Sequence, residues 1–247
     1  MTELFGGEEV GITFLTGAGL STAAGIPDFR GPQGVWTRDP LAERMSTLSW
    51  YLKSPEVRER AWQMRLESGI WAASPTEAHY RIAKAEEQAD VKAVVTQNTD
   101  GLHTLAGSSP DKVLEVHGSA RTWQCEGCDA TGPMEDQIRR VKDGEPDPAC
   151  PKCGGITRAT TILFEEMLKT DVIEAAFEAA ESCDWIIAIG TSLSVTPVAH
   201  MFPMAIESGA RGVIINAEPT PFDAYAEQVV RGDLQDTVPR VLDELLS

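Results

Sequence analysis

The stretch Ile12-Thr13-Phe14-Leu15-Thr16-Gly17-Ala18-Gly19 decides the fold. Its first five residues form an apolar, β-branched run, which stops at a Gly-Ala-Gly turn followed by small residues as far as Gly25. This pattern predicts a buried strand, a tight turn and the start of a helix. The backbone N–H groups at such a helix start are able to hold a phosphate. Taken alone the signal is weak, because a dinucleotide fingerprint requires glycine where Thr22 stands and a plain strand–helix connection explains the turn equally well.

Similar apolar runs follow at 90–96, 113–118, 185–189 and 212–216, and helical patterns cover 39–73, 171–182 and 236–246. Continuous apolar strands that alternate with helices predict an α/β fold, a Rossmann-like parallel sheet with helices on both faces. Polar residues and glycines stand where the strands end, at 97–101, 117–118, 190–192 and 216–218. Ligands of open parallel sheets bind beyond the carboxyl ends of the strands, so we expect the site there.

Composition narrows the class of protein. The chain has 247 residues and a formal charge of −17, from 38 acidic and 21 basic side chains. The length suits one large domain or a domain with an inserted module. The acidic excess argues against nucleic-acid and membrane partners, because it cannot neutralise phosphates. No run reaches the roughly 18 apolar residues of a membrane span and residues 1–5 do not resemble a secretory signal, so we expect a cytoplasmic protein.

Residues 119–157 differ from the rest, with four cysteines, four prolines and few aliphatic residues, so we expect no hydrophobic core of their own. Cys125-x2-Cys128 and Cys150-x2-Cys153 are 21 residues apart, a spacing that allows four thiolates to bind one structural zinc ion. Disulfides or free thiols are the alternative, which a reducing compartment disfavours. Cys183 is expected to be a small buried hydrophobic residue.

We therefore predict a split domain. Residues 1–38, 76–118 and 158–247 form the Rossmann-like part, and 39–75 with 119–157 form a smaller module of a helical insertion and a zinc-ribbon-like insertion. On fold logic alone a nicotinamide oxidoreductase is the alternative, but the GxGxxG pattern is missing.

The polar residues at the strand ends allow two interpretations. His117 suits a general base near neutral pH, or is a structural histidine bonded to the backbone. Asn98, Asp100 and His103 suit a ligand site, or form an Asx turn and a helix cap.

Together the motifs are much more specific than any one of them. They resemble the signature of the sirtuins, the NAD-dependent protein deacylases, in the family's order from residue 11 to about 235, and the chain is similar to short bacterial members. The matching segments are Gly17-Ala18-Gly19-Leu20-Ser21, Gly25-Ile26-Pro27-Asp28-Phe29-Arg30, Thr96-Gln97-Asn98-Thr99-Asp100-Gly101-Leu102-His103, Val116-His117-Gly118, the two CxxC pairs, Gly190-Thr191-Ser192-Leu193 and Ile215-Asn216-Ala217-Glu218.

The resemblance implies roles for these residues toward NAD. The pyrophosphate would lie at Gly17, Ala18 and Gly19, with Ala23 nearby, and the flexible cofactor loop would hold Asp28, Phe29 and Arg30, with Phe29 shielding the reacting ribose carbon. The nicotinamide side would be held by Gln97, Asn98, Asp100 and His117. The phosphate, ribose and adenine contacts would come from Gly190, Thr191, Ser192, Asn216, Glu218, Asp233 and Leu234.

The same resemblance implies the reaction. An acetyl group would pass from lysine to ADP-ribose with release of nicotinamide, with His117 as general base and Asn98 as the second catalytic residue. The acetylated lysine of a protein would bind at His117, Ile162, Phe164 and Val195. Mono-ADP-ribosyl transfer, removal of longer or acidic acyl groups and a non-catalytic NAD-binding module stay open. The oligomeric state is not indicated, although a monomer is compatible with the chain.

Three positions depart from the family pattern. Thr99 stands where isoleucine is usual, and Glu165 replaces the glycine of a Phe-Gly-Glu motif that normally pairs with the substrate backbone. Acidic-group deacylases carry Tyr-x-x-Arg in the helical insertion, whereas the nearest match here is Trp62-x-x-Arg65. We therefore favour acetyl over succinyl groups.

Overall fold

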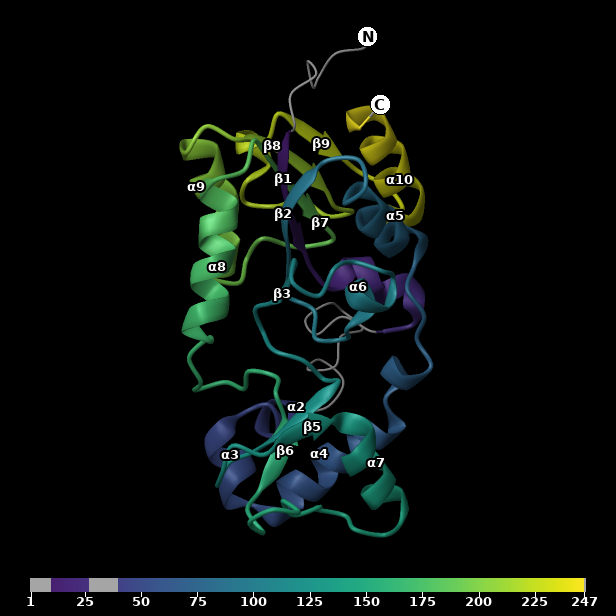
Figure 1. Ribbon diagram of the computed structural model, residues 1–247, viewed down its shortest axis with the longest axis vertical. Coiled ribbons are helices and arrows are strands. Elements are labelled where there is room, and N and C mark those ends of the chain that lie inside the picture. Colours follow the sequence, from purple (N-terminus) through teal and green to yellow (C-terminus); the bar gives the residue numbers. More distant parts are fainter. Residues whose placement is uncertain (1–9, 27–39, 247) are drawn as a thin grey trace.

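The computed structural model describes residues 10–26 and 40–246. Its larger part is a six-stranded sheet in the order β3-β2-β1-β7-β8-β9, and all neighbouring strands are parallel (Figure 1). The strands are β1 (Gly11–Thr16), β2 (Asp90–Thr96), β3 (Val113–Glu115), β7 (Trp185–Ile189), β8 (Arg211–Ile215) and β9 (Gln228–Val230). The predicted α/β fold is confirmed. The edge strand β9 was not anticipated, because it is only three residues long.

Helices cover both faces of this sheet, which explains why its central strands β1 and β7 are buried along their whole length. One face packs against α5 (Glu77–Ala85) and α10 (Leu234–Leu245), and the other against α8 (Thr170–Glu181) and α9 (Met201–Glu207) (Figure 1). Alternate strand residues divide between the two cores, so Phe14 and Ile187 face α5 and α10 while Leu15 and Ile186 face α8 and α9.

The order of the strands indicates where a ligand is expected to bind. The chain leaves β1 toward β2 and β3 on one side and later returns to β7 on the other side. Connections that diverge from neighbouring parallel strands open a crevice at their carboxyl ends. The Gly-Ala-Gly turn follows β1 at this point and continues as a short 3₁₀ helix, η1 (Ala18–Ala24). Short helices η3 (Val198–His200), η4 (Asp223–Tyr225) and α6 (Leu102–Leu105) lie in other connections.

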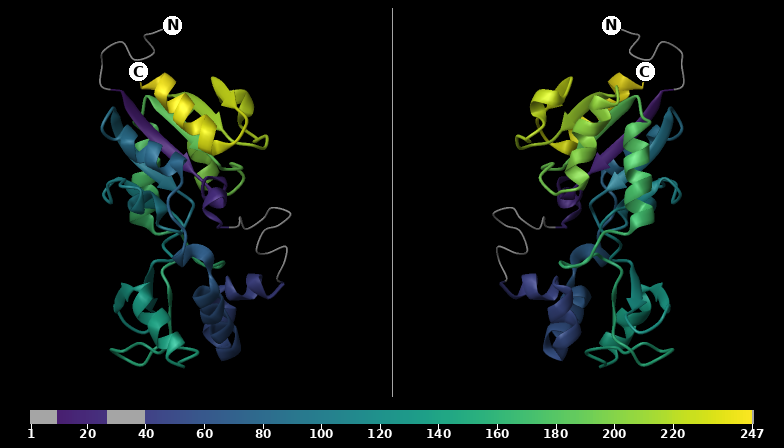
Figure 2. Two further views of the ribbon diagram at one scale, coloured as in Figure 1. Left: turned by 90° about the vertical axis from the view of Figure 1, so that its right-hand side faces the viewer. Right: turned by 90° about the vertical axis from the view of Figure 1, so that its left-hand side faces the viewer.

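Two insertions lie side by side beyond that end of the sheet (Figure 2). The helical insertion contains α2 (Pro40–Met45), α3 (Leu48–Lys53), α4 (Pro55–Glu67) and η2 (Gly69–Trp71). The cysteine-bearing insertion contains α7 (Met134–Lys142) and the antiparallel sheet β5-β4-β6, formed by β5 (Thr131–Pro133), β4 (Thr122–Cys125) and β6 (Thr157–Ala159). The exact division into domains stays a prediction.

The cysteine-bearing insertion contributes more buried hydrophobic residues than its sequence suggested, and they form one cluster with residues of the helical insertion. Helix α7 contributes Met134, Ile138 and Val141, which pack around Trp123. Trp62 of α4 completes the cluster and has no exposed surface. The two insertions therefore share this core. Within residues 10–26 and 40–246, no helix combines the length and apolar character required to cross a membrane.

Candidate active site

The glycine turn after β1 packs directly against the turn after β7. The amide of Gly17 donates to Ile189 O at 3.1 Å, and the amide of Gly19 donates to Gly190 O at 2.9 Å. A Cβ atom on Gly19 would lie 2.9 Å from that same oxygen, which excludes any larger residue there. Glycine is thus required for packing, and two of the three amides expected to face a phosphate are already hydrogen-bonded within the protein. The third amide of the turn belongs to Ala18 at the start of η1.

A buried polar chain runs from this turn to the loop after β2. Asn98 Nδ2 donates to Gly17 O and to Ser21 Oγ, both at 3.1 Å, and Ser21 Oγ donates to Asp100 Oδ2 at 2.7 Å. The other oxygen of Asp100 accepts from Leu102 N, the first amide of α6, at 2.9 Å, as in an Asx turn. All three polar side chains are buried. The predicted turn is present at Asp100, whereas His103 contacts Thr16 Oγ1 at 2.9 Å, and a ligand site at these residues stays a prediction. Ser21 links Asn98 to Asp100, which the sequence did not indicate.

His117 is held in one tautomer. Its Nδ1 lies 3.0 Å from Gln97 O, and because a carbonyl only accepts, Nδ1 carries the proton. In the neutral ring Nε2 is then the proton acceptor, as a general base requires. The Gln97 side chain donates to Thr191 Oγ1 at 2.8 Å, and Ile162 N donates to His117 O at 2.9 Å. The segments after β2 and β6 therefore contact this histidine, and Gln97 connects it to the segment after β7.

Three titratable groups lie near these residues, of which His79 and His103 are buried and Glu115 is half-buried. The rings of His79 and His103 are 4.9 Å apart, and burial lowers the pKa of His79 to about 4 and of His103 to about 3, so both are neutral near pH 7. The pKa of Glu115 is raised to about 7, mainly by burial and also by the charge of Asp100, while hydrogen bonding from Ser119 and the charge of Arg121 act in the opposite direction. Buried charge is thus minimised around Asp100.

Arg121 connects the start of β4 with the Asp100 loop and the helical insertion, a role that the sequence did not indicate. Its Nε donates to Asp100 O at 2.7 Å, its Nη2 donates to Ile70 O at 3.1 Å, and the guanidinium lies 5.6 Å from the Trp71 ring centroid. The backbone of the Asp100 loop is therefore fixed from the helical insertion and the start of β4. Arg121 lies 21 residues beyond Asp100, in the cysteine-bearing insertion. No local sequence pattern therefore indicates this contact.

Of the residues expected on the adenosine side, Leu234 packs against the turn after β7, while Asn216 and Asp233 make local side-chain contacts. Leu234 lies 3.0 Å from the position of a Cβ on Gly190, which has a positive φ of 62°. Asn216 Nδ2 donates to Glu218 O at 2.8 Å, and Asp233 caps α10 by accepting from Gln235 N at 2.9 Å. Ser192 is exposed beside the buried Thr191.

The expected substrate residues are only partly brought together. Ile162 reaches His117 through its amide, whereas Phe164 exchanges backbone hydrogen bonds with Ser46 and Leu48 of the helical insertion. Val195 is half-buried before η3, and within the described ranges no hydrogen bond joins it to residues 162–166. Ala23 lies in η1, and Asp28, Phe29 and Arg30 lie outside the described residues.

The four cysteines of the insertion converge on one point. Their Sγ atoms all lie within 4.8 Å of one another, with 3.5 Å between Cys125 and Cys153 and 3.8 Å between Cys128 and Cys150. These distances exceed an S–S bond of about 2.05 Å and match the edges of a tetrahedron with Zn–S bonds of about 2.3 Å. Amides of Gly127, Lys152 and Gly155 donate to three of the sulfurs, as thiolates require. The donor set therefore suits one structural zinc ion.

Cys183 is separate from this cluster. It is buried between α8 and β7, and its thiol donates to Ala180 O at 3.3 Å. The expectation of a small buried residue is confirmed.

The comparisons with known proteins agree with this geometry. The Sir2 family model matches residues 17–197. An NAD-dependent protein deacetylase 2 from Streptomyces coelicolor is 46% identical over 94% of this chain and 96% of its own length. An NAD-dependent protein deacetylase from Sulfurisphaera tokodaii is 40% identical over 94% of this chain and 90% of its own.

Solved structures give the same result. The structure of Sir2Tm bound to a propionylated peptide has a TM-score of 0.82 at 31% identity, covering 94% of this chain and 92% of that one. A complex of Sir2 with a p53 peptide and NAD+ has a TM-score of 0.82 at 33% identity, over 94% and 92% of the two chains. The chain belongs to the Sir2 family.

Proposed function

We propose that this protein is an NAD-dependent protein-lysine deacetylase that transfers the acetyl group of lysine to ADP-ribose and releases nicotinamide. The observation that carries the proposal is the His117 tautomer. Gln97 O fixes the proton on Nδ1, so that Nε2 of the neutral ring would be the proton acceptor. The curated relatives named as NAD-dependent protein deacetylases support the same activity.

Each part of the crevice has a distinct task in this proposal. Bound NAD supplies an electrophilic ribose carbon and a nicotinamide leaving group. Asp100 would orient the carboxamide, because Ser21 and the α6 amide hold its carboxylate in place. Asn98 would order the ribose side, since Gly17 O and Ser21 fix its amide. His117 would accept the proton, and the buried surroundings of these groups would limit competing hydrolysis.

The first prediction tests the role of His117. We expect the purified protein to release nicotinamide and free lysine from NAD and an acetyl-lysine peptide, and His117→Ala to lower kcat by about 10² to 10⁴, the usual contribution of a general base. Mass spectrometry of the peptide and of the ADP-ribose product provides the measurement. The matched control is His200→Ala, which removes an exposed histidine from the end of η3. Normal turnover in His117→Ala would contradict the assignment.

Products also separate the alternative functions. A mono-ADP-ribosyltransferase would leave the added mass on the protein, and a non-catalytic module would release no nicotinamide. The Trp62-x-x-Arg65 pair favours acetyl over acidic acyl groups, because Trp62 is fully buried in the shared core and Arg65 lies over its ring at 5.7 Å and donates to Ala61 O. A panel of acetyl, propionyl, succinyl and myristoyl peptides would decide between them.

The partner we infer is an acetylated protein, without nucleic-acid or membrane partners, in keeping with the charge of −17. A cytoplasmic location is supported by four cysteines that are free for zinc.

A further inference from the structure

The segment from Thr160 to Glu166 connects all three parts of the molecule. Its beginning pairs with the start of β4, where Thr160 N donates to Thr122 O, and Ile162 N then donates to His117 O. Further along, Phe164 N donates to Ser46 O at 2.7 Å and Leu48 N donates to Phe164 O at 3.1 Å. The segment therefore joins the zinc-ribbon-like insertion, the catalytic histidine and the helical insertion within seven residues.

Glu165 has an unusual backbone conformation in this segment. Its φ is +77°, and Leu193 is the one other non-glycine residue with a positive φ in residues 10–26 and 40–246. A side chain is disfavoured in this left-handed region, which glycine occupies at no cost. Strained residues persist only where surrounding contacts hold them, and they gather at functional sites. The usual glycine of the family would relieve the strain, so the glutamate side chain must supply a compensating interaction.

That interaction is a pair of hydrogen bonds from Ser49, at the start of α3, to the Glu165 carboxylate, which we call the clasp. Glu165 Oε2 accepts from Ser49 N at 2.9 Å, and Oε1 accepts from Ser49 Oγ at 3.0 Å. Hydrogen bonds to an ionised carboxylate are stronger than those between neutral groups, and a bidentate pair also fixes orientation. The carboxylate satisfies an amide in the first turn of α3, where negative charge is favourable.

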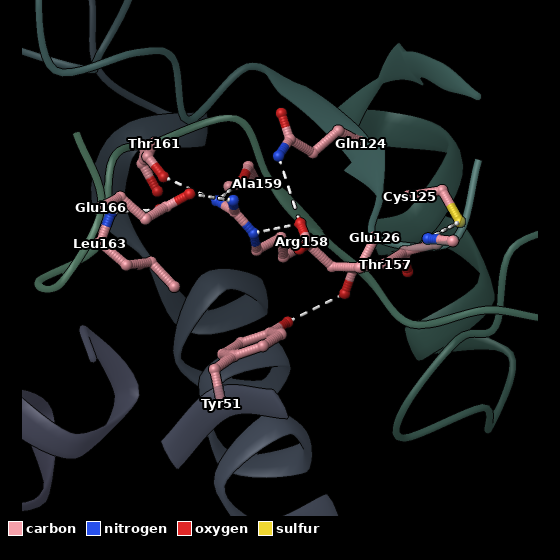
Figure 3. Close-up of polar contacts among 11 residues, drawn as sticks. Tyr51, Gln124, Cys125, Glu126, Thr157, Arg158, Ala159, Thr161, Leu163 and Glu166 are labelled. Carbon is pink, nitrogen blue, oxygen red and sulfur yellow. Dashed lines mark hydrogen bonds and ion pairs between the residues drawn. The ribbon is translucent and has the colours of Figure 1, made fainter. Parts of the chain in front are cut away.

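The neighbouring Glu166 contacts the zinc-ribbon-like insertion instead of the helical insertion. It accepts from Arg158 Nη2 and from Leu163 N, while Arg158 also pairs with Glu126 and donates to Thr161 O (Figure 3). This arginine is buried and belongs to β6. The two adjacent glutamates thus hold opposite sides of the segment, Glu166 on the zinc-ribbon-like insertion and Glu165 on the helical insertion.

We propose that Glu165 is a positioning residue whose clasp on Ser49 holds the helical insertion against residues 162–166 and thereby sets the affinity for the acylated peptide. The inference rests on the proposed function. Because Ile162 joins this segment to His117 through the backbone, a fixed segment presents the peptide to the histidine in one geometry. The clasp does not touch the reacting groups, so its loss is expressed in the KM for peptide and not in kcat.

The experiment compares Glu165→Gly, Ser49→Ala and the double variant with the unchanged protein. Glycine removes the clasp and also relieves the backbone strain, so a loss of affinity is then attributable to the clasp. We expect Glu165→Gly to raise the peptide KM about fivefold and to leave kcat and the KM for NAD within about twofold, in line with one lost charge-assisted pair at an exposed position. Ser49→Ala keeps one of the two hydrogen bonds and should have a smaller effect.

The double variant tests whether the two residues act as one unit. Its peptide KM should match that of Glu165→Gly alone, because neighbours in one interaction are not additive. The matched control is Glu67→Gln, an exposed glutamate of the same insertion that accepts from Gln63. Independent effects of Ser49→Ala and Glu165→Gly would overturn the proposal, as would an unchanged peptide KM in Glu165→Gly.

A second readout separates this proposal from the proposed function. Amide hydrogen exchange of residues 46–53 should be faster in Glu165→Gly and unchanged in Glu67→Gln, whether or not the protein turns over a peptide. An unchanged protein that releases no nicotinamide would refute the function, and the exchange data would then still test the clasp. A peptide KM, kcat and NAD KM that change in proportion to a lower melting temperature would reduce Glu165 to a purely structural role.

Discussion

At the residue scale, Glu115 makes the stability of the fold depend on pH. Burial raises its pKa from 4.5 to about 7, so the folded protein binds a proton that the unfolded chain has lost between those values. Stability then decreases as the pH rises from about 4.5 to 7 and stays constant above. The full shift corresponds to about 3 kcal/mol, which we reduce to the order of 2 kcal/mol for the solvent access that the carboxyl keeps.

The variant Glu115→Gln tests this directly, because glutamine resembles the neutral carboxyl. We expect the variant to match the unchanged protein near pH 5 and to be more stable by about 2 kcal/mol near pH 8. Urea unfolding curves at several pH values give the difference, and Glu178→Gln on the exposed face of α8 is the control. A difference that does not change with pH would mean that Glu115 is ionised in the folded state throughout.

The same scale shows which site residues could be predicted from sequence. Asn98 and Asp100 follow a strand directly, so their position at the sheet edge is a local property of the chain. Arg121 and Ser21 reach Asp100 from other segments, and only tertiary packing brings them there. Glu165 could be predicted only in part. Its departure from the family pattern is visible in the sequence, but its contact with Ser49 is not.

At the element scale, the zinc-ribbon-like insertion depends on its four thiolates. The core around Trp123 is small and the strands β4, β5 and β6 are three or four residues long. A sheet of three such short strands is at the lower limit of what is stable alone, whereas structural zinc binding supplies about 10 to 16 kcal/mol of folding free energy in small modules. The CxxC spacing predicted the metal site, but α7 was missed because its apolar residues are few and separated by charges.

We therefore expect one zinc ion per chain, and removal by a strong chelator to unfold this insertion before the parallel sheet. The tryptophan emission should shift to the red, because Trp62 and Trp123 lose their burial, and deacetylation should cease, because β6 leads into the segment bound to His117. Metal analysis and fluorescence provide the measurements. Cys128→Ser should lose zinc, while Cys183→Ala should keep it. A zinc-free protein with unchanged emission and melting temperature would contradict the prediction.

At the scale of the whole molecule, alternation of apolar strands and helices was enough to predict the sheet, since its central strands are buried on both faces. The association of the two insertions was not predictable, because Trp62 and Trp123 are 61 positions apart in the sequence and share no periodic pattern.

The charge of −17 is also a property of the whole chain. It acts over distances comparable to the Debye length of about 10 Å in 0.1 M salt, beyond the reach of the individual hydrogen bonds in the crevice.

This charge should act differently on the two substrates. NAD is anionic and is repelled at long range, so its binding must depend on short contacts, for which the crevice offers the Ala18 amide at the start of η1 and the Thr191 hydroxyl. A lysine-rich acetylated peptide is attracted at long range instead. Raising the salt from about 0.05 to 0.3 M should therefore raise the KM of a basic peptide several-fold and change the KM of NAD by less than about twofold. Steady-state kinetics with a neutral acetylated peptide as control makes the comparison. A steep loss of NAD affinity with salt would show that long-range attraction, and not the local amides and hydroxyls, holds the cofactor.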